Sequence, residues 1–156
     1  MNGANAQQAW LRTLEEALPV FGHRNWIVVA DSAYPAQSSP GIETVAANAE
    51  QLDVLRTVLR LLDASKHVRG IFHTDDELAL ITEEDAPGAS AHREALDTLL
   101  AGRERATAPH EQIIAKLDEA ARRFRVLVIK TRLYTPFTSV FIELGCGYSL
   151  PKQDRG

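Results

Sequence analysis

Two histidines and one aspartate are the residues of this sequence best suited to acid–base chemistry. His23 and Asp31 lie near the two ends of an apolar run in FGHRNWIVVADSAYPA, residues 21–36. His110 follows Pro109 and falls in the first turn of a predicted helix, where the positive end of the helix dipole disfavours the charged imidazolium. A neutral imidazole there can exchange hydrogen bonds with a hydroxyl near neutral pH. Spacing alone still favours a structural interpretation, in which Asp31 caps a turn and His110 is a first-turn residue that faces water.

Other chemistries find little support in the sequence. It contains no GxGxxG segment after a strand, no phosphate-binding loop and no GxSxG elbow. The spacing of His67, His73, Asp75 and Asp76 matches no standard set of metal ligands, so we expect these residues in a solvated loop. Cys146 is the single cysteine, which excludes an intramolecular disulfide framework. We therefore expect neither a metal nor a cofactor.

The elements that must position these residues alternate between helix and strand, which predicts α/β layers with helices covering a largely parallel sheet. The run Trp26–Ala30 is apolar throughout, as in a strand covered on both faces. Apolar spacing predicts helices over 7–18, 44–64, 91–101 and 109–124, strands over 26–30, 68–72, 126–130 and 139–144, a strand or helix start at 77–81, and an extended piece at 103–107.

Length and charge limit the class of protein. With 156 residues the chain is expected to form a single domain over 1–150, followed by a loose tail at 151–156. The formal net charge is −4 and the basic residues are scattered, so we expect no nucleic-acid or anionic membrane partner. No apolar run approaches the roughly 20 residues that span a bilayer. These features predict a soluble, cytoplasmic protein.

Taken in order, several of these residues resemble the ribose pyranase and fucose mutarotase family over about residues 18–147. The resemblance rests on Gly22-His23, an apolar strand ending in Asp31, Pro35, His110-Glu111-Gln112 and Pro136 before the last strand. It implies a three-layer α/β/α fold with a largely parallel or mixed central sheet and no cofactor. It also implies the interconversion of cyclic forms of free monosaccharides, and a homo-oligomer with sites between subunits.

Residue roles follow from the same resemblance. It implies that His23 is the proton donor and that Asp31 and His110 bind sugar. The family's Tyr-Ala-Asn triplet on the final strand is replaced here by Phe137-Thr138-Ser139, so a phenol hydroxyl and an amide are missing from the sugar-binding set.

Two further residues are candidates to supply the lost polar groups. Tyr134 precedes the last strand, and Glu143 is expected on the same strand face as Phe137 and Ser139. Because the triplet departs from the family pattern, we predict poor handling of ribose and fucose and a preference for another ligand, larger or charged.

The strand between His23 and Asp31 bears on assembly. From Trp26 to Asp31 an extended chain covers about 17 Å, so one small sugar touches both residues only if the preceding loop folds back or two subunits share a pocket. We predict the shared pocket. Three interpretations of function stay open: a sugar isomerase acting by His-assisted ring opening, a non-catalytic sugar or small-ligand binding protein, and an assembly protein with a vestigial pocket.

Overall fold

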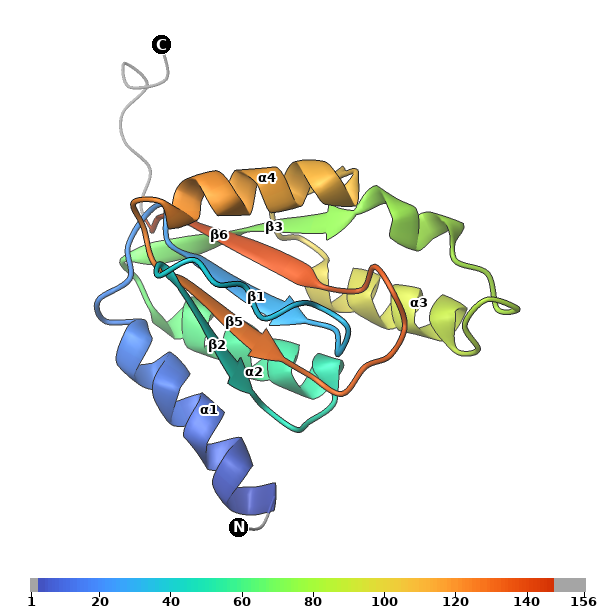
Figure 1. The fold of residues 1–156 in the computed structure, drawn as a ribbon, viewed down its shortest axis with the longest axis horizontal. Coiled ribbons are helices and arrows are strands. Elements are labelled where there is room, and N and C mark those ends of the chain that lie inside the picture. Colours follow the sequence, from blue (N-terminus) through green and yellow to red (C-terminus); the bar gives the residue numbers. More distant parts are fainter. Residues whose placement is uncertain (1–2, 148–156) are drawn as a thin grey trace.

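The structure is a computed structural model and describes residues 3–147 of the chain. A six-stranded sheet runs through it in the order β2-β5-β1-β6-β3-β4 (Figure 1). The strands are β1 (Trp26–Ala30), β2 (Ile42–Ala46), β3 (Val68–Asp75), β4 (Arg105–Ala108), β5 (Val126–Lys130) and β6 (Val140–Cys146). The helices are α1 (Gly3–Ala17), α2 (Gln51–Ala64), α3 (Ala89–Leu100) and α4 (His110–Ala121), with a short 3-10 helix, η1 (Asp76–Leu80).

The direction of the strands fixes where a site can form. β5 pairs in parallel with β1 and β2, and β3 pairs in parallel with β4. β6 lies between β1 and β3 and is antiparallel to both. All strands except β6 therefore end at one edge of the sheet, here called the carboxyl edge, and β6 begins there. The opposite edge is called the amino edge.

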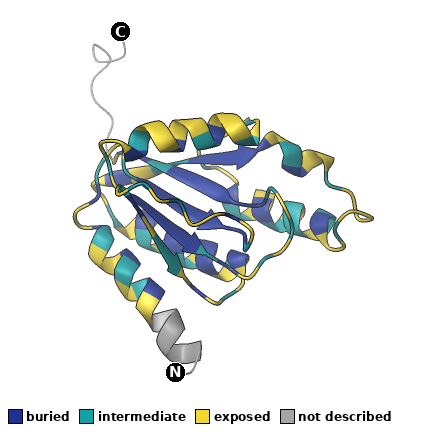
Figure 2. Ribbon diagram, in the orientation of Figure 1, coloured by how far each residue is buried: buried dark blue, intermediate teal, exposed yellow. Residues whose placement is uncertain are grey.

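Helices cover both faces of the sheet, which gives three layers. Every residue of β1 is buried. Ile27 and Val29 belong to a core shared with α1, α2 and α3, whereas Trp26, Val28 and Ala30 belong to a core shared with α4. Figure 2 shows the buried strands between helices whose outer faces are exposed. The predicted three-layer α/β/α class with a mixed sheet is confirmed.

One predicted helix was wrong at its start, and the open choice between strand and helix at 77–81 falls to helix. Residues 42–46 form β2, not the start of the helix predicted over 44–64, which begins only at Gln51. β2 is an edge strand paired with β5, and its apolar residues fit a helical stripe as well as a half-exposed strand. Residues 77–81 fall mostly in η1, which is helical.

The predicted solvated loop at His73 and Asp75 was also wrong. β3 continues to Asp75. Its last four residues, from Phe72 to Asp75, pair with β4 on one side, and its residues as far as Thr74 pair with β6 on the other. This double pairing buries His73, Thr74 and Asp75. Within residues 3–147 no helix is long and apolar enough to cross a membrane. The tail predicted at 151–156 lies outside the described residues.

Candidate functional site at the carboxyl edge

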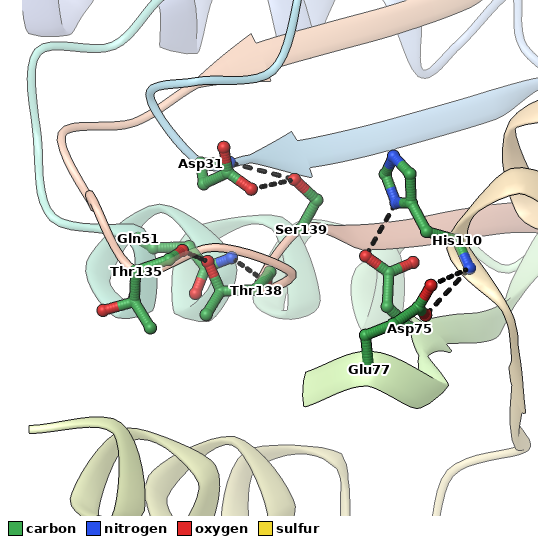
Figure 3. Close-up of polar contacts among 8 residues, drawn as sticks. All are labelled: Asp31, Gln51, Asp75, Glu77, His110, Thr135, Thr138 and Ser139. Carbon is green, nitrogen blue, oxygen red and sulfur yellow. Dashed lines mark hydrogen bonds and ion pairs between the residues drawn. The ribbon is translucent and has the colours of Figure 1, made fainter. Parts of the chain in front are cut away.

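Four polar residues converge at the carboxyl edge (Figure 3). Asp31 directly follows β1, Asp75 ends β3, His110 begins α4, and Ser139 directly precedes β6. They meet because β1 and β3 both end at this edge, α4 begins there, and the antiparallel β6 between the two strands starts there. We call these four residues the carboxyl-edge cluster. In open α/β sheets, this edge is where ligands bind.

Asp31 is held by hydrogen bonds on both carboxylate oxygens. The Oγ of Ser139 accepts the backbone N–H of Asp31 at 3.0 Å and donates to Asp31 Oδ2 at 3.1 Å. The backbone N–H of Ala33 donates to Asp31 Oδ1 at 2.9 Å, an Asx turn that stabilises the chain after β1. Each carboxylate oxygen keeps a second lone pair that can accept a hydrogen bond from a ligand hydroxyl.

His110 and Asp75 form a hydrogen-bonded pair. His110 Nδ1 lies 2.8 Å from Asp75 Oδ2, and the Asp75 side chain is fully buried while that of His110 is 25% exposed. Burial raises the pKa of Asp75 to about 6, against the lowering effect of the His110 ring. The backbone N–H of His110 also donates to both carboxylate oxygens of Glu77, at 2.9 and 3.2 Å. Glu77 thus satisfies a free N–H at the start of α4.

Aromatic rings line the side of this pair. The rings of Phe137 and Phe141 lie edge-on to the His110 imidazole, with centroids 5.7 and 6.2 Å away. Phe137 has a φ of 61°, an uncommon backbone conformation for a bulky residue. Tyr34 packs edge-on against Phe141 and donates its hydroxyl to Gln37 Oε1 at 2.7 Å. Burial, followed by the charges of Asp118, Asp75 and Asp31, raises the pKa of Tyr34.

The sequence-predicted site residues divide into two groups. Asp31, His110, Phe137 and Ser139 come together at the carboxyl edge. His23 does not join them within one chain: it is exposed and lies in the loop before β1, at the amino edge.

Three other predicted residues point elsewhere. Tyr134 is 87% exposed. Thr138 is buried, donates its hydroxyl to the Thr135 carbonyl at 2.7 Å and has its own carbonyl bound by Gln51. Glu143 lies opposite Trp26, the first residue of β1, and its Oε1 is 3.0 Å from His73 Nε2. It lies on the same face of the sheet as Ser139, as predicted from its strand position. It is nevertheless remote from the cluster, because Trp26 is at the amino edge.

Asp75 and Glu77 are the site residues that sequence reasoning missed. Asp75 ends a strand as Asp31 follows one, but its run contains Arg69, His73 and Thr74 and is apolar only in part. This weaker signal was obscured because the strand was predicted to end at residue 72. Within the described chain, no group of three or more His, Cys, Asp or Glu side chains could hold a metal ion.

The fold and the cluster together define a small α/β protein in which an imidazole and two carboxylates meet at the carboxyl edge of a mixed sheet. The RbsD / FucU transport protein family matches residues 7–147, and the chain belongs to this family. This confirms the family inferred from the order of the residues.

Named relatives agree with this assignment. D-ribose pyranase 1 of Streptomyces griseus is 30% identical over 143 residues, which cover 89% of this chain and 82% of the relative. Bacillus subtilis RbsD complexed with D-ribose superposes with a TM-score of 0.58 at 20% identity, over 85% of this chain and 91% of the other. Fucose mutarotase from Streptococcus pneumoniae, in complex with L-fucose, gives a TM-score of 0.55 at 15% identity over the same shares. These two structures share the fold.

Proposed function

We propose that this protein is a mutarotase- or pyranase-like isomerase, which interconverts cyclic forms of a free monosaccharide or a sugar-like ligand. The observation that carries the proposal is the carboxyl-edge cluster, in which a buried carboxylate and a partly exposed imidazole lie 2.8 Å apart beside the hydrogen-bonded Asp31. Membership of the RbsD/FucU family and the 30% identity to a D-ribose pyranase support the same reaction class.

The reaction explains why these residue types are needed. Opening a cyclic hemiacetal removes a proton from the anomeric hydroxyl and adds one to the ring oxygen, and reclosure after rotation gives another anomer or ring size. Histidine titrates near neutral pH and suits both transfers. A placed acid or base contributes roughly 10²–10⁴-fold to each such step. We assign the proton at the ring oxygen to His23, and sugar binding to Asp31 and His110.

The position of His23 makes assembly part of the proposal. β1 separates His23 from Asp31, with Trp26 at its amino end and Ala30 at its carboxyl end. A sugar bound at the carboxyl-edge cluster therefore needs His23 from a second copy of the chain. We propose a homo-oligomer in which each pocket is completed by a neighbouring subunit. In the same oligomer, Tyr134 and Glu143 are candidates for contact with the ligand.

A second candidate function is binding without turnover. It is favoured by Phe137, which carries no hydroxyl, and by Ser139, whose Oγ is already engaged twice by Asp31. Both features reduce the polar groups available to a sugar. Loss of turnover with retention of the pocket would leave a ligand-binding protein, and loss of both would leave an assembly protein.

Magnetization-transfer NMR on a panel of free monosaccharides separates these functions. An isomerase accelerates exchange between the resonances of anomers or ring forms in proportion to its concentration. A binding protein broadens or shifts ligand resonances without accelerating exchange, and an assembly protein does neither. Absence of accelerated exchange with every neutral and amino sugar in the panel would overturn the proposal.

A further inference from the structure

Asp75 contacts the imidazole in a way that determines which ring nitrogen is free. Its Oδ2 lies 2.8 Å from Nδ1 of His110, and a carboxylate can only accept a hydrogen bond. Nδ1 must therefore carry the hydrogen, which leaves the lone pair on Nε2. Figure 3 shows this second nitrogen on the side of the ring away from Asp75.

The charges around His110 also favour its use in proton transfer. A ring in the first turn of a helix meets the positive end of the dipole, which opposes protonation. The Asp75 carboxylate counters this effect directly, because it bonds the ring, and Glu77 counters it at the helix start by accepting the His110 backbone N–H. Two carboxylates, Asp75 at the ring and Glu77 at the start of α4, therefore hold His110 in place.

The second oxygen of Asp75 points to a functional reason for its burial. Asp75 Oδ1 is buried and has no hydrogen-bond partner among the described residues. A buried carboxylate with an unsatisfied oxygen weakens folding, and such groups cluster at functional sites.

We propose that Asp75 is a positioning residue that holds His110 in the Nδ1–H tautomer and so presents Nε2 as the acceptor for the anomeric hydroxyl proton. This inference rests on the proposed function and adds a second proton-transfer group to it. The anomeric O–H gives its proton to His110 Nε2 while the carbonyl forms. The bond from the anomeric carbon to the ring oxygen breaks, its electron pair stays on that oxygen, and His23 supplies the proton there. Reclosure reverses both transfers.

The groups that face Asp75 define the expected pH dependence. They are His110 on α4, Glu77 on η1, Asp31 after β1 and the phenol of Tyr34. Protonation of Asp75 weakens its role as the acceptor that holds the Nδ1–H of His110, so the exchange rate is expected to fall as the pH drops through about 6. In Asp75→Asn the part of this acidic limb that comes from Asp75 is expected to disappear.

Nitrogen-15 NMR of labelled histidine tests the proposal without any sugar. The signal of His110 is identified by its loss in His110→Gln. In the wild type we expect neutral His110 as the Nδ1–H tautomer. In Asp75→Asn the fraction of the Nε2–H tautomer is expected to rise, because the asparagine amide can donate to Nδ1 as well as accept from it and carries no charge. The matched control Glu77→Gln changes an acid that touches only the backbone N–H, and it should keep the wild-type tautomer.

Sugar exchange supplies the second readout. Asp75→Asn is expected to slow exchange by roughly 10²–10⁴-fold. The inference would be overturned if neutral His110 were the Nε2–H tautomer in the wild type, or if its tautomer did not change in Asp75→Asn. It would also be overturned if the tautomer changed in Asp75→Asn while the rate of sugar exchange stayed the same. A wild type that exchanges no sugar but keeps the Asp75-dependent tautomer would instead overturn the proposed function, and with it the role given to Nε2.

Discussion

The Oγ of Ser139 makes two hydrogen bonds to Asp31, accepting the backbone N–H at 3.0 Å and donating to the carboxylate at 3.1 Å. This arrangement ties the start of β6 to the end of β1 and fixes the Asp31 carboxylate at the carboxyl edge. It also uses the only polar atom of the Ser139 side chain. Ser139 is therefore better suited to orienting Asp31 than to recognising a sugar hydroxyl itself.

Substrate preference should follow from this engagement. The Phe137 side chain offers a ligand no polar group, and the Ser139 hydroxyl keeps one lone pair but no free hydrogen. Each sugar hydroxyl left unpaired in a closed pocket costs about 1–3 kcal/mol. Two lost contacts would weaken ribose or fucose turnover by roughly a hundredfold or more. We expect low exchange of both sugars by the wild type and a gain in Phe137→Tyr/Ser139→Asn, measured as kcat/KM by exchange NMR.

The single variant Phe137→Tyr is the control for disturbance of Asp31, since it leaves the Ser139 hydrogen bonds intact. If the wild type already exchanges ribose or fucose as well as the double variant does, the altered preference is wrong.

Charge at the carboxyl edge should discriminate against anionic ligands. Asp31, Asp75 and Glu77 all bring carboxylates to this region. The Asp75 carboxylate is close enough to the others to be affected by the charges of His110, Glu77 and Asp31. A phosphate group held near them would be repelled. We expect a neutral pentose to be exchanged at least tenfold faster than its 5-phosphate at equal concentration. Equal rates, or faster exchange of the phosphate, would show that a cation from elsewhere completes the pocket.

Removing the Asp75 charge should stabilise the protein at neutral pH. The pKa of Asp75 in the folded protein is about 6, above the ordinary value of 3.8 for an aspartate. The native state therefore binds more protons than the unfolded state between these pH values. The contribution of Asp75 to stability therefore falls as the pH rises from about 4 to above 6. Asp75→Asn should raise the free energy of unfolding at pH 8 by on the order of 1 kcal/mol and give no such gain at pH 4.

Urea unfolding at the two pH values measures this difference. Glu77→Gln serves as the comparison, because its carboxylate caps α4 rather than pairing with the ring. A variant Asp75→Asn that is less stable at pH 8, or whose stability change is the same at both pH values, would contradict the account.

Much of the fold was predictable because its strongest signals are local. The uninterrupted apolar run predicted β1, and Pro109 predicted the start of α4. These two elements placed Asp31 directly after β1 and His110 in the first turn of α4. β2 was missed because an edge strand is only half buried and its apolar residues also fit a helical stripe.

The site was less predictable because it depends on pairing between distant segments. Asp75 is buried only through the register of β3 with β4 and its place beside β6, and the bond between Ser139 and Asp31 joins residues 108 apart. No local pattern encodes either contact. The separation of His23 from Asp31, by contrast, followed directly from the length of the strand between them.

The separation of His23 from the cluster leads to a prediction for two single variants. His23 is exposed, so His23→Ala should abolish exchange and leave the unfolding temperature nearly unchanged. Asp31→Ala should also abolish exchange, since it removes the carboxylate that Ser139 and Ala33 hold at the carboxyl edge. Loss of exchange in His23→Ala together with a large loss of stability would return His23 to a structural role.

The exchange rate of mixed oligomers tests the central claim, that one catalytic pocket is built from His23 of one subunit and the carboxyl-edge cluster of another. The inactive variants His23→Ala and Asp31→Ala are mixed in equal amounts under conditions that allow subunits to exchange. Native mass spectrometry verifies that mixed oligomers form. Random mixing gives intact residues at roughly one shared pocket in four, so we predict recovery of about a quarter of the wild-type exchange rate. Verified mixed oligomers that remain as inactive as either variant alone would contradict the account.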